Sequence, residues 1–206
     1  MVITEISAQK KKGRYNLFVD NSFYSGIDAE TIVKHGLKVG TEIDKDCLEE
    51  LVVESETRSA FDKLITIISR QLYSKRDIEL KLIKYGYNKI AIEQAIKKAE
   101  EYGYINDKTY AKIIVDSKKL KSKMEIKNSL FLKGIKQDII VEQVKDIDEE
   151  EETERAMIIA EKYMKNKDSS EKNIAGLYNY LMRRGFNSSS ISKVLKRYKI
   201  EYYEEG

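Results

Sequence analysis

The chain of 206 residues is long enough for one large or two ordinary domains, and its 41% hydrophobic content is typical of a globular protein. Its single cysteine excludes an intrachain disulfide, and no apolar run is long enough to cross a membrane. The net charge of +3 is small, but residues 56–147 hold 20 basic and 13 acidic side chains, whereas residues 1–55 hold 7 and 10. The N-terminus has no signal-peptide pattern, so we expect a cytoplasmic protein whose middle part suits a polyanion or an acidic protein surface.

The first part of the chain predicts a small α+β cap. Alternating and β-prone residues favour strands at 2–8, 14–20 and 22–27, and the Asp20-Asn21 pair favours a hairpin turn. Asp28 is placed to begin a short helix that Gly36 ends.

From about residue 56 the pattern becomes helical and occurs three times at a spacing near fifty residues. The copies are SKRDIELKLIKYGY, SKMEIKNSLFLKGI and NIAGLYNYLMRRGF, which end near Gly86, Gly134 and Gly185. Aligning these glycines brings four apolar positions into register: Ile78 with Ile126 and Leu177, Leu82 with Leu130 and Leu181, Ile92 with Ile140 and Ile191, and Ile96 with Val144 and Leu195. Such a period predicts stacked units, each too small to bury its apolar face alone.

The helix ends are also marked in each copy. Ser74 with Asp77, Ser122 with Glu125, and Asp168 with Glu171 are predicted to form capping boxes. Each glycine is expected to be a left-handed residue just after a helix, so that Tyr87 contacts Leu82, Ile135 contacts Leu130, and Phe186 contacts Leu181. A further helix follows each glycine, so each copy is expected to contain three helices.

We therefore predict a mainly α protein with three tandem three-helix repeats, helix-turn-helix-like elbows and a small α+β N-terminal cap. The expected parts are the cap at 1–55 and the repeats at 56–106, 107–147 and 148–206. The acidic run Asp148–Glu154 lies at the start of the third repeat. It is interpreted as a solvated linker with acids in the first turn of the next helix, and the alternative is an acidic docking patch.

The sequence contains no phosphate-binding loop, dinucleotide fingerprint or zinc-ligand spacing. We therefore expect no catalytic residue, metal or cofactor, and a protein that binds rather than an enzyme. The single histidine, His35, is expected to meet carbonyls at a helix end, and Cys47 is expected to be a small buried side chain.

Basic side chains recur near the same elbow of each repeat. Any one of them is more readily explained as a solvated lysine or arginine, but together they predict a surface that binds phosphates or acidic groups. The candidates are Lys75, Arg76, Lys81, Lys84, Lys118, Lys119, Lys121, Lys123, Lys127, Arg183, Arg184, Lys193, Lys196 and Arg197. Tyr178 and Tyr180 are candidates for base stacking, although core packing is the commoner role of such residues.

The combination of RQLYSKRDIELKLIKYGY, EEYGYINDKTYA, FLKGI and YLMRRGF, with RYNLFVDNSFYSGI near the N-terminus, resembles the RecX family of recombination regulators over nearly the whole chain. The resemblance implies a modulator of RecA that binds the RecA nucleoprotein filament, with single- or double-stranded DNA as a further candidate partner. We expect the protein to be a monomer. It implies inhibition of ATP hydrolysis and strand exchange, which limits recombination and the SOS response. The helices bearing Arg76, Lys81, Lys123, Lys127, Arg183 and Arg184 would then carry the binding surface.

Two mechanisms stay open within this function, namely capping of filament ends and binding in the filament groove. A helical DNA-binding protein that acts without RecA is an alternative, because helix–glycine–helix elbows resemble a helix-turn-helix. The expected recognition helices lack a consistent face of Arg, Asn and Gln for base edges. A protein-only scaffold is a third class, which would bind neither DNA nor a filament.

Overall fold

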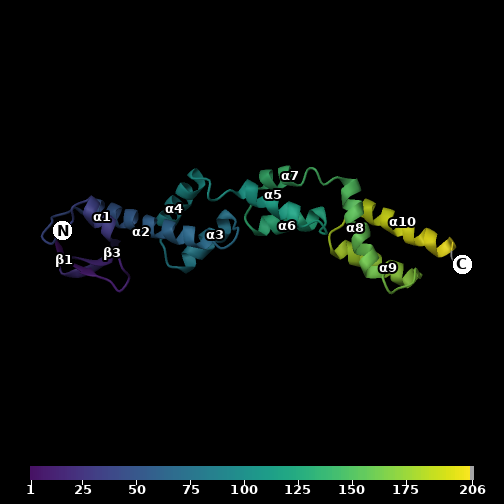
Figure 1. Ribbon diagram of the computed structural model, residues 1–206, viewed down its shortest axis with the longest axis horizontal. Helices are drawn as coiled ribbons and strands as arrows, with labels where there is room; N and C mark the ends of the chain where they lie inside the picture. Colours follow the sequence, from purple (N-terminus) through teal and green to yellow (C-terminus); the bar gives the residue numbers. More distant parts are fainter. Residues whose placement is uncertain (205–206) are drawn as a thin grey trace. The chain divides into compact units, whose positions relative to one another are not determined.

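The computed structural model describes the backbone of residues 1–204 and the side chains of residues 1–198. Within residues 1–204, three strands are followed by ten helices (Figure 1). The chain divides into two compact units, Met1–Ile105 and Asn106–Gly206. The predicted fold class, a mainly helical chain behind a small α+β part, is confirmed.

The three strands form one antiparallel sheet in the order β1-β2-β3, with β1 at Ile3–Ala8, β2 at Arg14–Val19 and β3 at Ser22–Asp28. The predicted hairpin turn is present between β2 and β3. Asp20 and Asn21 both have positive φ angles, 48° and 64°, as a tight turn matching the twist of the two strands requires.

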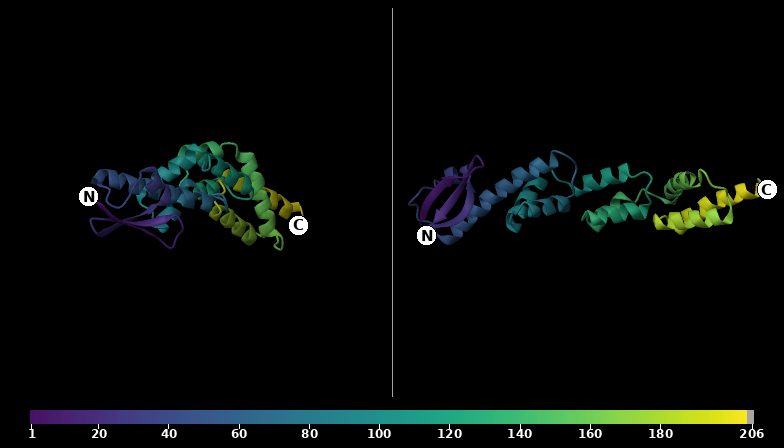
Figure 2. Two further views of the ribbon diagram at one scale, coloured as in Figure 1. Left: turned by 60° about the vertical axis from the view of Figure 1, so that its left-hand side comes forward. Right: turned by 90° about the horizontal axis from the view of Figure 1, so that it is seen from below.

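The sheet packs against the first half of a long helix. Helix α1 spans Ala29–Lys34 and α2 spans Lys45–Ile68, and the sheet lies beside the N-terminal half of α2 (Figure 2). The core between them contains Ile3, Leu17, Val19, Ile27, Leu37, Leu48 and Leu51. Helix α2 continues across residue 55, where the sequence suggests the end of the cap, so the sheet and the first helical repeat share this helix. The four-part division of the chain stays a prediction.

Asp28 begins α1 as predicted, and its carboxylate has several partners. Its oxygens accept hydrogen bonds from the backbone and the hydroxyl of Thr31, both at 2.9 Å, and Oδ1 lies 3.3 Å from a guanidinium nitrogen of Arg58. Burial raises the pKa of Asp28, but hydrogen bonds with Ser55 and Thr31 and the charge of Arg58 outweigh it, so the pKa lies below its ordinary value of 3.8.

Replacing Asp28 by alanine is expected to lower the free energy of unfolding by about 1 kcal/mol at neutral pH, because the helix loses its N-cap. Asp28→Asn keeps a capping oxygen but loses the charge. Since the folded-state pKa lies below 3.8, the charge stabilises the fold fully above about pH 3.8, and this contribution is lost as the pH falls below that value and through the lower folded-state pKa. The stability difference between the wild type and Asp28→Asn should therefore shrink as the pH is lowered from about 5 to about 2. Thermal unfolding across this range measures it, and a constant difference would contradict the role of the charge.

Each of the three copies contains three helices, as predicted (Figure 1). The first uses the second half of α2 with α3 at Lys75–Lys84 and α4 at Lys89–Glu101. The second contains α5 at Asp107–Ser117, α6 at Lys123–Leu132 and α7 at Gln137–Gln143. The third contains α8 at Glu149–Met164, α9 at Glu171–Arg183 and α10 at Ser188–Glu204. Each copy has a core of its own, and the aligned residues Ile78, Ile126 and Leu177, like Leu82, Leu130 and Leu181, are completely buried.

The helix starts agree with the sequence in two copies and differ in the third. The hydroxyls of Ser74 and Ser122 accept hydrogen bonds from amides three residues later, at 3.2 Å and 3.0 Å. In the third copy Ser170, and not Asp168, is the N-cap residue, and it makes no side-chain capping bond. Asp168 instead accepts hydrogen bonds from the amide of Ser170 and the side chain of Asn173, so the predicted capping box there is wrong.

The three glycine turns are confirmed. Gly86, Gly134 and Gly185 have φ angles of 85°, 75° and 78°. In each turn the glycine amide donates to the carbonyl three residues earlier at 2.9 Å, and the next amide donates to the carbonyl five residues earlier at 3.2–3.4 Å. This pair of bonds is the Schellman motif, which stops the helix and directs the following apolar side chain back onto it.

Two expectations for single residues are wrong. Cys47 is exposed, because its place in the first turn of α2 faces away from the buried Leu48. His35 does not meet helix-end carbonyls through its ring, since its Nε2 lies 3.0 Å from the carboxylate of Glu54.

Candidate binding surface

The connection between α5 and α6 is held against α8 by a buried arginine. Arg155 is 6% exposed, and its guanidinium donates to the carbonyls of Lys118 and Lys121 at 3.5 Å and 3.1 Å and to the carboxylate of Glu151 at 2.6 Å. The carbonyls at the end of α5 have no partner within that helix, and Arg155 supplies one. One side chain of repeat three therefore fixes the lysine-rich connection of repeat two.

The neighbouring Glu152 forms a second link. It is 5% exposed and accepts hydrogen bonds from the amide of Lys123 at 3.4 Å and from the side chain of Asn187 at 2.8 Å. Helix α8 begins at Glu149, so the acidic run does supply the first helical turn, as expected from the helix dipole. The expectation that the run is solvated is wrong for Glu152, whose carboxylate is buried and accepts hydrogen bonds from repeats two and three.

The elbows of repeats two and three touch directly. The hydroxyl of Ser122 donates to the carbonyl of Arg184 at 2.7 Å while it accepts from the amide of Glu125. The backbone of Gly185 approaches Ser122 and Met124 so closely that a β-carbon there would lie 3.1 Å from one and 3.3 Å from the other. In the unit Asn106–Gly206, the elbows of repeats two and three therefore lie against each other.

Several of the fourteen candidate basic residues are occupied by other groups. Three of them form ion pairs, namely Lys75 with Glu100 at 2.8 Å, Lys193 with Glu149 at 2.5 Å, and Lys121 with Glu125. Three others donate hydrogen bonds, namely Lys123 to the carbonyl of Ile147 at 2.5 Å, Lys118 to the hydroxyl of Ser129, and Arg184 to the hydroxyl of Tyr180 at 2.8 Å. Desolvation lowers the pKa of Lys118, although the charge of Glu125 opposes this effect. These side chains therefore stabilise the elbows as well as contributing positive charge to them.

The other candidates are more available. Lys81 lies over the ring of Tyr73 at 4.8 Å, Arg183 donates to a carbonyl of its own helix, and Arg197 lies 3.9 Å from Glu161. Among residues that the structure describes, no carboxylate lies within 4.0 Å of Arg76, Lys84, Lys119, Lys127 or Lys196. Lys119, Lys127 and Arg183 lie in repeats two and three, whose elbows meet.

Tyr178 and Tyr180, the tyrosines singled out from the sequence, have different environments. Tyr180 stacks on Tyr163 at a centroid distance of 4.8 Å, so its ring is used for packing, whereas Tyr178 is 43% exposed. Sequence reasoning missed a cluster in which Tyr102, Tyr104 and Phe61 meet edge to face or tilted, with Lys98 over two of the rings. The signal in the sequence that could have indicated this cluster is the string Tyr102-Gly103-Tyr104.

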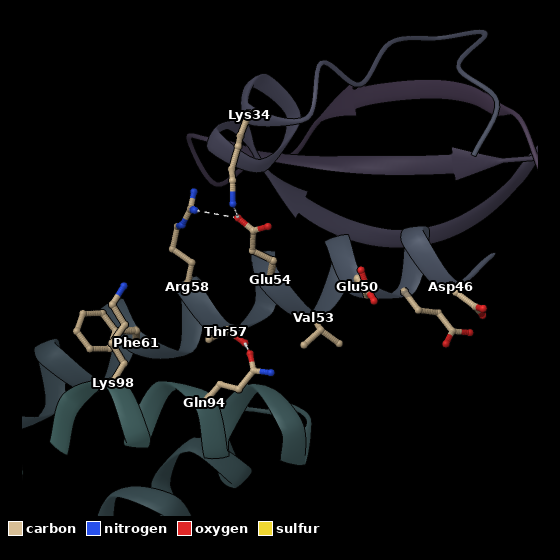
Figure 3. A pocket seen from close by; sticks show the side chains of 11 residues that line it. Lys34, Asp46, Glu50, Val53, Glu54, Thr57, Arg58, Phe61, Gln94 and Lys98 are labelled. Carbon is tan, nitrogen blue, oxygen red and sulfur yellow. Dashed lines mark hydrogen bonds and ion pairs between the residues drawn. The ribbon is translucent and has the colours of Figure 1, made fainter. Parts of the chain in front are cut away.

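A hollow of about 700 Å³ lies between α1, α2 and α4 in the first unit (Figure 3). Its central carboxylate, Glu54, is 2.8 Å from Lys34 and 3.3 Å from Arg58, as the figure shows. The hydrogen bond from Lys34 lowers the pKa of Glu54, with help from His35, so this carboxylate is a poor proton acceptor. The described residues contain no cluster suited to a metal ion and no helix long and apolar enough to span a membrane.

These features define a class of protein, namely a helical-repeat protein in which buried hydrogen bonds between repeats hold the basic elbows in place. Comparison with known proteins identifies the family. Residues 1–44 match the model of the regulatory protein RecX N-terminal domain, and residues 149–195 match that of the third three-helix domain of RecX. The chain is 32% identical to the regulatory protein RecX of Clostridium botulinum (strain Alaska E43 / Type E3), over 98% of this chain and 99% of the relative. It therefore belongs to the RecX family of regulatory proteins.

Other relatives agree. The regulatory protein RecX of Clostridium beijerinckii is 33% identical over 95% of this chain and 94% of its own. A crystal structure of a regulatory protein RecX has a TM-score of 0.69 and 25% identity, covering 94% of this chain and 98% of that one. The crystal structure of RecX from Lactobacillus salivarius has a TM-score of 0.63 and 23% identity over 70% of this chain and 97% of that one, and it supports the fold.

Proposed function

We propose that this protein binds the RecA–single-stranded DNA filament and inhibits its ATP hydrolysis and strand exchange, thereby restraining recombination and the SOS response. Membership of a family of regulatory proteins supports this function. The observation that best supports this function is the contact between the elbows of repeats two and three, which brings basic side chains from both repeats together in one unit. A phosphate backbone or an acidic protein surface is the chemistry such a surface binds.

In this proposal the protein acts in the cytoplasm as a monomer, by binding and without catalysis, and it needs no cofactor. The contacts are the fourteen basic residues, and the available ones contribute most to affinity. Arg76 and Lys84 are such contacts in repeat one, and Lys119, Lys127 and Arg183 are such contacts in repeats two and three. The same basic residues also contact DNA strands within the filament, as a secondary interaction.

The test is the rate of ATP hydrolysis by RecA on single-stranded DNA as this protein is added. Inhibition is expected well below one molecule per RecA, because a few bound regulators affect many filament subunits. A parallel titration of DNA binding without RecA excludes simple sequestration of the DNA. Unchanged hydrolysis with tight, salt-sensitive binding to bare duplex would contradict the proposal and favour a RecA-independent DNA-binding protein.

A charge-reversal variant tests the surface. Replacing Lys119, Lys127 and Arg183 by glutamate is expected to raise the half-inhibitory concentration about tenfold, because exposed charge pairs contribute modest energies that add up. The matched control reverses Lys45, Lys89 and Lys162, three exposed lysines outside the proposed surface, and gives the same net charge. Equal loss in both variants would mean that only net charge matters.

A further inference from the structure

One exposed apolar residue recurs at the same position in all three repeats. Ile83 of α3, Phe131 of α6 and Met182 of α9 each lie three residues before the glycine that ends the helix. Their exposed fractions are 53%, 66% and 45%, and none belongs to the four packed cores of the described residues. We call Ile83, Phe131 and Met182 the elbow residues.

The backbone holds the three elbow residues in the same way. The carbonyl of each accepts the amide of its glycine, Gly86, Gly134 or Gly185, at 2.9 Å. The preceding residue in each helix is a leucine that is completely buried in the core of its repeat. Because one neighbour is anchored inside and the carbonyl is bonded in the Schellman motif, each elbow residue is held outward at the end of its helix.

Helix-end geometry requires the glycine and the buried leucine, but it requires nothing apolar at this position. A polar residue would leave all the bonds of the motif intact and would remove nothing from the four cores, since none of these side chains belongs to them. The fold of a single repeat therefore does not explain why all three elbow residues are apolar. An exposed apolar side chain that recurs on a binding protein indicates contact with a partner.

The chemistry of the elbow residues favours a protein surface over nucleic acid. Isoleucine and methionine have no aromatic face on which a base could stack, so the three positions share only apolar bulk. A basic residue lies within about one helical turn of each in the sequence, namely Lys84, Lys127 and Arg183. The complementary surface is an apolar depression with carboxylates at its rim.

We propose that the elbow residues are docking residues, one for each repeat, that enter equivalent acidic-rimmed apolar depressions on successive identical subunits of a protein filament. Three equivalent projections in tandem repeats suit a partner that is itself periodic, because each added contact raises the effective concentration of the next. The inference rests on the proposed function, in which the periodic partner is the RecA filament.

The experiment measures binding of the full chain to RecA filaments assembled on poly(dT) with a nonhydrolysable ATP analogue. Fluorescence anisotropy follows a dye on Cys47, the single cysteine, which is exposed. The variants are Ile83→Ser, Phe131→Ser, Met182→Ser and their pairs. Control variants replace Val33, Val39 and Val141 by serine, since these valines are 79%, 64% and 51% exposed at unrelated positions. Circular dichroism checks that all variants are folded.

Each elbow variant is expected to weaken filament binding about tenfold, and each pair about a hundredfold, because contacts on separate subunits are independent. The controls and the affinity for bare poly(dT) should stay unchanged. Elbow variants that bind like the controls, or that lose bare-DNA affinity equally, overturn the docking role. A single substitution that accounts for the entire loss overturns the periodic partner. A wild-type protein that does not bind the filament instead contradicts the proposed function itself.

Discussion

Replacement of Arg155 by alanine is expected to lower the free energy of unfolding of the Asn106–Gly206 unit by about 3 kcal/mol. The guanidinium is buried and donates to the carbonyls of Lys118 and Lys121 as well as to Glu151. Alanine removes the guanidinium donor from both carbonyls, of which that of Lys118 keeps only the amide of Lys121, and it opens a void in the contact between the repeats. Urea unfolding of the full chain, followed by circular dichroism, measures the loss.

Two variants sharpen this test. Arg155→Lys keeps the charge but cannot donate in several directions at once, so it should recover part of the stability and not all of it. Lys162→Ala changes an exposed side chain on the same helix and should alter stability by less than about 0.5 kcal/mol. Hydrogen exchange of the amides at 118–122 should quicken in Arg155→Ala. Unchanged exchange there would mean that the arginine does not position the α5–α6 connection.

Gly185→Ala is expected to cost about 3 kcal/mol, whereas Gly86→Ala is expected to cost about 1 kcal/mol. Both glycines have positive φ angles, 78° and 85°, so both substitutions strain the backbone similarly. They differ in their surroundings. A β-carbon at Gly86 meets nothing within 4 Å, whereas one at Gly185 lies 3.1 Å from Ser122 and 3.3 Å from Met124.

The difference between the two glycine variants isolates the contact between repeats two and three. Ser122 cannot move away without losing its bonds to Glu125 and Arg184, so the contact has little room to relax. Urea unfolding of both variants gives the two losses under the same conditions. Equal losses would show that the elbows of repeats two and three are not in contact in solution, which would contradict the joining of basic side chains on which the proposed function depends.

Much of the fold is predictable from the sequence because its signals are local. Gly86 marks a helix end through its own backbone freedom, and Ser74 marks a helix start through a bond to an amide three residues away. The third capping box is wrong because Ser170 is the N-cap residue, so that Asp168 lies two residues before it and accepts from the amide of Ser170 instead.

The site was less predictable, since it depends on contacts between residues distant in the chain. Lys118 and Lys119 are adjacent and equally basic in the sequence. Lys118 is directed to Ser129, whereas Lys119 is exposed. Glu152 lies in an acidic run that predicts a solvated side chain, and nothing nearby in the sequence indicates its partners, the amide of Lys123 and the side chain of Asn187.

The repeat, the register of its core and the turns that end its helices can be predicted from the sequence alone, because periodicity and backbone preference act within a few residues. The sequence also carries the resemblance that the comparisons confirmed. Which charges remain available, which carboxylate is buried and which apolar residues stay exposed can be seen only in the folded structure. These properties depend on burial, since the free energy of a charge or an apolar side chain depends on what packs around it. Such neighbours can be 62 residues apart in the chain, as Ser122 and Arg184 are.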